Sequence, residues 1–345
     1  MFDDSLLDDT TALQRVDPAL RHLAEAGARI RREVGASSEQ SEDLSPSDQV
    51  RAVVAAGRDS RLLRAILEPR CPVPFVAWPG PGLPGWAGAL DVVAVLAQAP
   101  DDLAATSAVS EAVRRGCELL VTCPEHSSVA ELAASRYTTV LPTHSQDALA
   151  GAVVLLRALH RLGLGPQVDA DEVAASLDAV AARCSPFVDL SNNPAKELAI
   201  GIGDCMPLLW GGSVLAARAS RRVAEAIRRA TGRTAIADAA DHLLPILSGT
   251  PPHDVFGDPF DDSESGPAGT TRPALIVVDD GTDDQVIREE RGRLAATAER
   301  QGVRVEIIAC DQGSEVSRYA TILALGSFMA LYTGVALGGP HEDRM

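Results

Sequence analysis

The chain has 345 residues, 46% of them hydrophobic and 3% aromatic, so its length fits two domains with cores built mainly from small aliphatic side chains. The formal net charge of −17 excludes the basic face that nucleic-acid binding requires and opposes docking on an anionic membrane. An anionic small molecule is still compatible, because helix N-termini and loop amides supply local positive potential. Of the 31 basic residues only Lys196 is a lysine, so a mechanism that needs a lysine has one candidate.

Cysteine usage and the N-terminus indicate a soluble, cytoplasmic protein. The six cysteines are scattered through apolar stretches without CxxC pairs, which is typical of free thiols in a cytosolic chain. The acidic Met1–Asp4 segment lacks the basic and apolar regions of a signal peptide. We expect no membrane span, because Ser, Thr, Tyr and Gly interrupt the most apolar run, Ala320–Gly338.

The first half of the chain divides into an N-terminal segment, residues 1–49, and a first α/β domain, residues 50–165. The N-terminal segment combines an acidic lead, a helix to about Val34 and a polar linker over residues 36–49. In the domain, short apolar runs alternate with helical patterns. The predicted strands are 51–56, 73–78, 90–96, 118–123 and 138–141, and the last predicted helix is 147–162.

A helical connector, residues 166–204, precedes a second α/β domain, residues 205–345. The connector holds two predicted helices, 170–184 and 193–201. The second domain has predicted strands at 207–210, 274–278 and 303–309, and predicted helices at 216–231, 283–301 and 315–337. Strands that are each followed by a helix predict parallel sheets with helices on both faces. The fold class is therefore α/β, with two tandem flavodoxin-like, three-layer sandwiches.

Two segments carry a family resemblance. The run NNPAKELAIGIGDCMPLLWGG at 192–212 and the run ILALGSFMALYTGVALGGP at 322–340 resemble bacterial bifunctional phosphoglucose/phosphomannose isomerases, which contain two sugar-isomerase (SIS) domains. More narrowly, the chain is similar to their divergent actinobacterial, TobH-like branch. The resemblance implies two SIS-type domains, a sugar-phosphate ligand, a homodimer, and aldose–ketose isomerisation of glucose or mannose 6-phosphate through a cis-enediol.

The resemblance also implies positions for the ligand contacts. The first phosphate loop falls on AGRDSRLL at 56–63, where Ser60 matches the family's serine and Arg58 adds a positive charge. The alternative interpretation is that Ser60 only begins a helix as its N-cap. The second loop departs from the family, because residues 97–102 carry two aspartates and no hydroxyl group. In the second domain, Ser213 and Arg218 are expected near the ligand.

The catalytic positions are less well matched. Arg218 and Glu225 keep the family's spacing, which makes Glu225 the candidate general base. The alternative is a solvated glutamate paired with neighbouring arginines on one helix. His242 and His253 are both candidates for ring opening, and each is also compatible with a surface histidine. The family's C-terminal lysine has no counterpart, and Lys196 is expected to pack structurally.

The sequence indicates neither a cofactor nor a metal ion. It contains no P-loop, HExxH or GxSxG motif, and the glycine pairs Gly201/Gly203 and Gly211/Gly212 lack the rest of a GxGxxG fingerprint. The aspartates at 279, 280, 283 and 284 follow a predicted strand and are interpreted as a solvated acidic turn. Two functions stay open: an aldose–ketose isomerase that uses Glu225, and a catalytically degenerate SIS protein that binds a sugar phosphate or a partner and regulates hexose-phosphate metabolism.

Overall fold

The structure is a computed structural model, and it describes residues 2–46, 49–99, 102–251 and 271–339. The chain divides into two units, each built from separate stretches of sequence. The five-stranded unit contains residues 25–176 and 313–320, and the four-stranded unit contains residues 1–24, 177–312 and 321–345. Two helices, α9 (Ala170–Arg183) and α14 (Glu315–Ala336), have residues in both sets.

The five-stranded unit is a parallel sheet with the strand order β2-β1-β3-β4-β5. Its strands are β1 (Ala52–Ala56), β2 (Phe75–Trp78), β3 (Asp91–Leu96), β4 (Glu118–Cys123) and β5 (Thr138–Pro142). Its helices are α3 (Ala26–Ala36), α4 (Ser38–Glu42), α5 (Ser60–Arg70), α6 (Leu103–Arg115), α7 (Ser128–Leu132) and α8 (Ala148–Arg161). This is the flavodoxin-like strand order, as the sequence pattern predicts.

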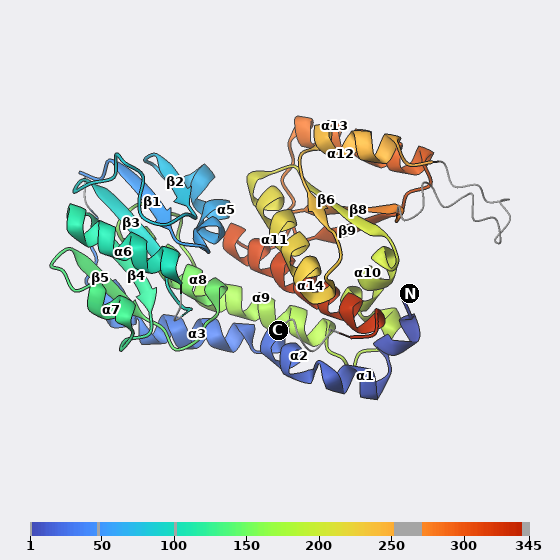
Figure 1. The fold of residues 1–345 in the computed structure, drawn as a ribbon, viewed down its shortest axis with the longest axis horizontal. Helices are drawn as coiled ribbons and strands as arrows, with labels where there is room; N and C mark the ends of the chain where they lie inside the picture. Colours follow the sequence, from blue (N-terminus) through green and yellow to red (C-terminus); the bar gives the residue numbers. More distant parts are fainter. Residues whose placement is uncertain (1, 47–48, 100–101, 252–270, 340–345) are drawn as a thin grey trace, which may run out of the picture. The chain divides into compact units, whose positions relative to one another are not determined.

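The side chains of the central strands β1 and β3 are buried on both faces, which explains their continuous apolar runs. On one face, Val54, Val93 and Val121 pack in a cluster with Ala and Val residues of α6. On the other face, α5 contacts β1 and β2, and α8 contacts β3 and β4. Figure 1 shows the helices layered on the sheet in this way.

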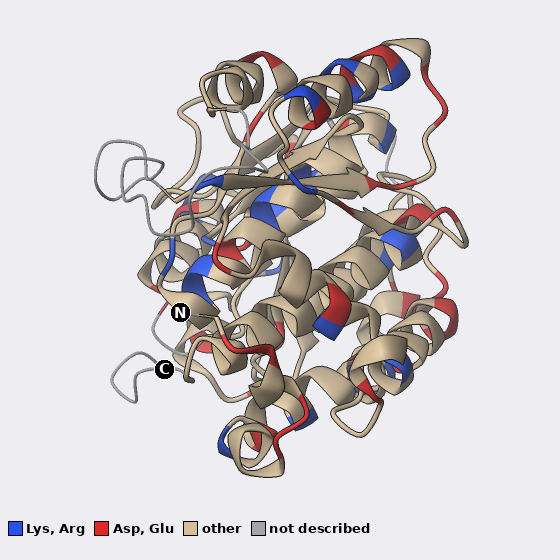
Figure 2. Cartoon of the chain, turned by 90° about the vertical axis from the view of Figure 1, so that its right-hand side faces the viewer, with Lys and Arg blue, Asp and Glu red and all other residues tan. Residues whose placement is uncertain are grey.

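The four-stranded unit contains a second parallel sheet, with the order β7-β6-β8-β9. Its strands are β6 (Met206–Gly211), β7 (Ile236–Ala237), β8 (Pro273–Asp279) and β9 (Val305–Ala309). Its helical elements are η1 (Asp4–Leu7), α1 (Thr10–Arg15), α2 (Asp17–Ala24), η2 (Leu190–Asn192), α10 (Pro194–Ile202), α11 (Val214–Thr231), α12 (Ala240–Ser248) and α13 (Gln285–Arg300). Leu208, Trp210 and Leu275 form a core with α12 and α13. In Figure 2, acidic and basic residues are interspersed along the helices at the top of the view, where α13 lies.

Several elements differ from the sequence-based expectations. The end of α3 and all of α4 lie inside the stretch predicted as a polar linker. The two-residue strand β7 is too short to show a period of two, so the pattern missed it. Helix α14 does have the length and apolar composition of a membrane span, but 78% of its most apolar 18-residue window is buried, as in the core helix of a globular protein.

The turn between β6 and α11 depends on close backbone approach. A Cβ atom at Gly211 would lie 2.5 Å from the carbonyl oxygen of Ala216, and one at Gly212 would lie 2.5 Å from Cγ2 of Ile287. Real Cβ atoms do not come this close to such neighbours, so only glycine lets the strand turn directly into the helix.

Gly211→Ala is therefore expected to destabilise the protein by about 3 kcal/mol, because the backbone of α11 must shift to make room. Thermal unfolding followed by circular dichroism measures the effect. Gly292→Ala is the matched control, because a Cβ at this exposed position in α13 would meet nothing within 4 Å. This control is expected to gain about 1 kcal/mol from helix propensity. Equal melting temperatures for the two variants would contradict the steric explanation.

Candidate functional site

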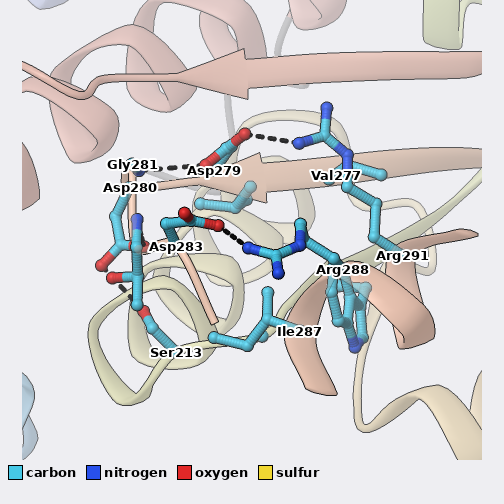
Figure 3. Close-up of a pocket in the computed structure, with 13 residues that line it drawn as sticks. Ser213, Val277, Asp279, Asp280, Gly281, Asp283, Ile287, Arg288 and Arg291 are labelled. Carbon is cyan, nitrogen blue, oxygen red and sulfur yellow. Dashed lines mark hydrogen bonds and ion pairs between the residues drawn. The ribbon is translucent and has the colours of Figure 1, made fainter. Parts of the chain in front are cut away.

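A cavity of about 240 Å³ lies at the carboxyl ends of β6 and β8 (Figure 3). In this sheet the chain leaves β6 for β7 on one side and returns to β8 on the other, so the cavity marks the topological switch point. Ligands of open α/β sheets generally bind at this place. The cavity, called the β6–β8 pocket below, is lined by Trp210, Gly212, Ser213, Val277, Val278, Asp279, Asp280, Gly281, Thr282, Asp283, Ile287, Arg288 and Arg291.

A buried carboxylate and a helix cap are joined at the base of the β6–β8 pocket. Ser213 is the N-cap of α11, and its Oγ accepts a hydrogen bond from the Ala216 amide at 2.9 Å. The same hydroxyl donates to Oδ2 of Asp280 at 2.8 Å. Asp280 is only 4% exposed, so its carboxylate depends on such donors for the solvation that water would otherwise supply. The orientation of Asp280 is thus tied to the start of α11.

Two ion pairs form the rim of the pocket. Arg291 donates to Oδ2 of Asp279 at 2.6 Å, and Arg288 pairs with Asp283. Arg288 and Asp283 are both well exposed, so their pair contributes little to stability and can rearrange. With Asp280 included, three carboxylates face two guanidinium groups. The pocket therefore has an excess of one negative charge.

The first sheet has a comparable switch point between β1 and β3. The turn after β1 passes through Gly57, whose φ of +91° suits glycine, and continues through Arg58 and Asp59 to Ser60 at the first position of α5. Arg58 is exposed, whereas Ser60 is 1% exposed and its Oγ has no hydrogen-bond partner among the described residues. A buried hydroxyl without a partner at a helix N-terminus is a place where an anion can complete the bonding.

Aspartates cap the neighbouring helices on this edge. The Asp102 carboxylate accepts hydrogen bonds from the first-turn amides of α6, at 3.0 Å from both Ala104 and Ala105. Asp147 caps α8 in the same way and also pairs with Arg29 at 2.8 Å. These carboxylates occupy the positions where a phosphate would bind at the N-termini of α6 and α8. At α5, in contrast, the N-cap residue makes no side-chain capping bond.

The structure places Glu225 away from the β6–β8 pocket. Glu225 lies in the middle of α11, twelve residues beyond Ser213, which is about 18 Å along the helix axis. Its carboxylate accepts a hydrogen bond from Arg222 at 3.2 Å, in the pairing that the alternative interpretation expects. Arg218 is half-buried on the same helix and does not line the pocket.

The two histidine candidates have different outcomes. His242 lies on α12, its side chain is 71% exposed, and its Nδ1 is 3.1 Å from Oδ2 of Asp238. The Ala239 amide and His242 both donate to Asp238 and lower the pKa of that carboxyl. The pair follows β7 on the same edge as the β6–β8 pocket but does not line it. His253 lies outside the described residues.

Lys196 is a structural residue of the four-stranded unit, as expected. Its side chain is 0% exposed, and Nζ donates to the Asp8 carboxylate at 2.6 Å and to the carbonyls of Val188 at 3.0 Å and Pro186 at 3.2 Å. The ring of Tyr332 lies 5.6 Å from Nζ. All three hydrogen bonds of the ammonium group are thus used within the protein.

Of the residues expected near the ligand, Ser213 lines the β6–β8 pocket, and Arg58 and Ser60 share one turn after β1. Arg288 and Arg291 were not among the candidates, and the interpretation of Asp280 as a solvated residue is wrong, because it is buried. The sequence did hold a signal for these residues. They follow the third strand of this sheet, and the end of that strand meets the end of the first strand at a topological switch point. Among the described residues, no group of three or more His, Cys, Asp or Glu side chains has a geometry that could hold a metal ion.

Comparisons with known proteins agree with this architecture. Residues 191–339 match the bacterial phospho-glucose isomerase C-terminal SIS domain. The chain resembles tagatose-6-phosphate ketose/aldose isomerase from Escherichia coli, with a TM-score of 0.65, 14% identity, and coverage of 96% of this chain and 95% of that one. It also resembles the C-terminal domain of glucosamine-fructose-6-phosphate aminotransferase from Francisella tularensis, with a TM-score of 0.62, 11% identity, and coverage of 93% and 96%.

A third similar structure is a glucose-6-phosphate isomerase like protein from Thermus thermophilus, with a TM-score of 0.51, 14% identity, and coverage of 92% and 94%. No curated protein sequence matches the chain. The predicted fold class is confirmed: two parallel sheets with flanking helices, as in the SIS phosphosugar isomerases.

The buried Lys196–Asp8 pair yields a stability prediction. Asp8→Asn is expected to destabilise the protein by about 3 kcal/mol, because it leaves a buried ammonium group without its counter-charge. Lys196→Met is expected to cost less, because the remaining Asp8 carboxylate is half-exposed and can be hydrated. Urea unfolding of both single variants and the double variant measures the coupling.

Asp4→Asn, at an exposed neighbouring position, is the control and should stay within about 0.5 kcal/mol of the wild type. If Asp8→Asn were as harmless as Asp4→Asn, the carboxylate would not be needed to hold the lysine in the core.

Proposed function

We propose that this protein binds a sugar phosphate, with the phosphate at the first turn of α5. The observation that carries the proposal is the buried, unpartnered hydroxyl of Ser60, next to the exposed guanidinium of Arg58 at a topological switch point. A phosphate there would accept hydrogen bonds from Ser60, from Arg58 and from first-turn amides of α5. Because aspartates already cap α6 and α8, the N-terminus of α5 is the favoured place for a phosphate on this edge of the sheet.

The comparisons support this ligand class. Residues 191–339 match a domain of bacterial phospho-glucose isomerases, and the similar structures are named for enzymes that act on 6-phosphorylated sugars. The fold therefore favours a hexose phosphate over other anions. The more specific assignment to phosphoglucose/phosphomannose isomerases of the TobH-like branch, the homodimer and the cytoplasmic location are further parts of the proposal, and they rest on the resemblance of residues 192–212 and 322–340.

We propose binding without isomerisation. Proton transfer between C1 and C2 requires a general base within hydrogen-bonding distance of the sugar. Glu225 instead pairs with Arg222 on its own helix, and His242 points to a neighbouring aspartate at the surface. The acidic loop after β3 also replaces the hydroxyl-rich loop of the family. These features favour the catalytically degenerate alternative, a protein that binds a sugar phosphate and regulates hexose-phosphate metabolism.

The phosphate site is tested by titrating the protein with glucose 6-phosphate and mannose 6-phosphate in a calorimeter. Arg58→Ala and Ser60→Ala are each expected to weaken binding by about tenfold or more, because each removes a hydrogen bond to a charged group. Asp59→Asn is expected to act in the opposite direction and strengthen binding, because it removes a negative charge beside the phosphate.

Arg114→Ala is the matched control, because Arg114 is an exposed arginine in the last turn of α6, at the far end of that helix from the carboxyl edge. It should leave the affinity unchanged. The proposal fails if Arg58→Ala and Arg114→Ala bind equally well, or if Asp59→Asn weakens binding.

The absence of turnover is tested by a coupled assay for fructose 6-phosphate with either substrate. Wild type and Glu225→Gln are expected to give the same background rate, since the Glu225 carboxylate is engaged by Arg222 on its own helix. Turnover in the wild type that disappears in Glu225→Gln would establish the isomerase instead.

A further inference from the structure

We infer that the β6–β8 pocket is a second ligand site, which binds an uncharged monosaccharide through its ring hydroxyls. This inference goes beyond the proposed phosphate site, because it concerns other residues and a ligand without a phosphate. The size of the cavity gives the first constraint. Its volume of about 240 Å³ is below the roughly 300–1,000 Å³ typical of pockets for drug-sized ligands, and it suits a single sugar ring.

The arrangement of donors and acceptors gives the second constraint. Each ion pair on the rim, Asp279–Arg291 and Asp283–Arg288, presents a carboxylate acceptor beside a guanidinium donor (Figure 3). A sugar hydroxyl both donates and accepts, so one hydroxyl can bond to both members of such a pair. Two adjacent hydroxyls of a sugar ring can therefore bond to the two neighbouring ion pairs, one hydroxyl to each pair.

The nearly balanced charge of the pocket favours a neutral ligand over an ion. Three aspartates repel a phosphate, and Ser213, which could have donated to one, is already bonded to Asp280. Arg288 and Arg291 offset two of these three negative charges, which leaves only a weak attraction for a cation. A neutral ligand loses the least free energy to such repulsion, so the site favours a sugar over a sugar phosphate.

The pocket also has a fixed base and an apolar side. Asp280 is more than nine-tenths buried and is oriented by the Ser213 hydroxyl, so an acceptor is already in place before a ligand arrives. Trp210, Val277 and Ile287 supply the apolar lining, against which the C–H groups of a sugar ring can pack. An apolar lining with a few fixed polar groups is typical of small-molecule sites.

The test uses the fluorescence of Trp210 in the full chain, with Trp78→Phe and Trp86→Phe so that Trp210 is the sole tryptophan. D-Glucose, D-mannose and D-fructose are titrated separately. At least one sugar is expected to change the emission saturably, with a dissociation constant on the order of 1 mM for so small a ligand. Asp280→Asn is expected to weaken that binding at least tenfold.

Arg288→Ala is the second variant, because Arg288 is 60% exposed and its loss does not threaten folding. It is expected to weaken binding about fivefold or more. Asp241→Asn, an exposed aspartate on α12 outside the pocket, is the matched control and should bind normally. Arg58→Ala should also bind the neutral sugar normally, which separates this inference from the proposed phosphate site.

The inference is overturned if none of the three sugars gives a saturable change up to 100-fold above the expected dissociation constant. It is also overturned if Arg288→Ala and Asp241→Asn bind alike. A glucose 6-phosphate affinity that exceeds the glucose affinity and falls in Arg288→Ala would show that the pocket takes the charged ligand instead.

Discussion

Every strand pair in the two described sheets is parallel, and this pairing dictates where reactive side chains can meet. Parallel strands require crossover helices, so all the loops that follow the strands gather on one edge of each sheet. The β1–α5 turn with Ser60 and the β6–α11 turn with Ser213 are equivalent positions in their two sheets. Both candidate sites thus result from strand topology, and the loops decide what each site can bind.

Electrostatics distinguishes the two edges. On the five-stranded unit, Asp102 and Asp147 cap their own helices, so the positive ends of α6 and α8 are neutralised within the protein. The α5 turn keeps an arginine and a buried hydroxyl for an outside anion. On the four-stranded unit, the Ser213 hydroxyl donates a hydrogen bond to Asp280. Arg288 and Arg291 pair with the two other aspartates of the pocket. This difference underlies the two proposals, a phosphate at the first edge and an uncharged sugar at the second.

A buried charge joins several helical segments of the four-stranded unit. Lys196 on α10 reaches Asp8 near the N-terminus and two backbone carbonyls that precede η2, and Tyr332 of α14 packs against it. Tyr332 in turn donates to the Cys184 carbonyl at 2.6 Å, and burial raises the pKa of its phenol. Because an unpaired ammonium group in a core is costly, these segments stabilise one another's positions. The one lysine of the chain thus serves structure and is not available for chemistry.

The amino-acid sequence by itself determined the fold class, because short apolar runs followed by helical patterns report burial on both faces of a parallel sheet. Residues 52–56, 91–96, 118–123 and 273–279 form strands close to their predicted bounds. It also located the turns with Ser60 and Ser213, since these follow strands directly. Only the tertiary structure decided the role of Asp280, whose carboxylate accepts a hydrogen bond from a serine 67 positions away, and of Glu225, whose helix carries it away from the pocket. Periodicity is a local property, whereas the partners of a side chain depend on which strand ends the topology brings together.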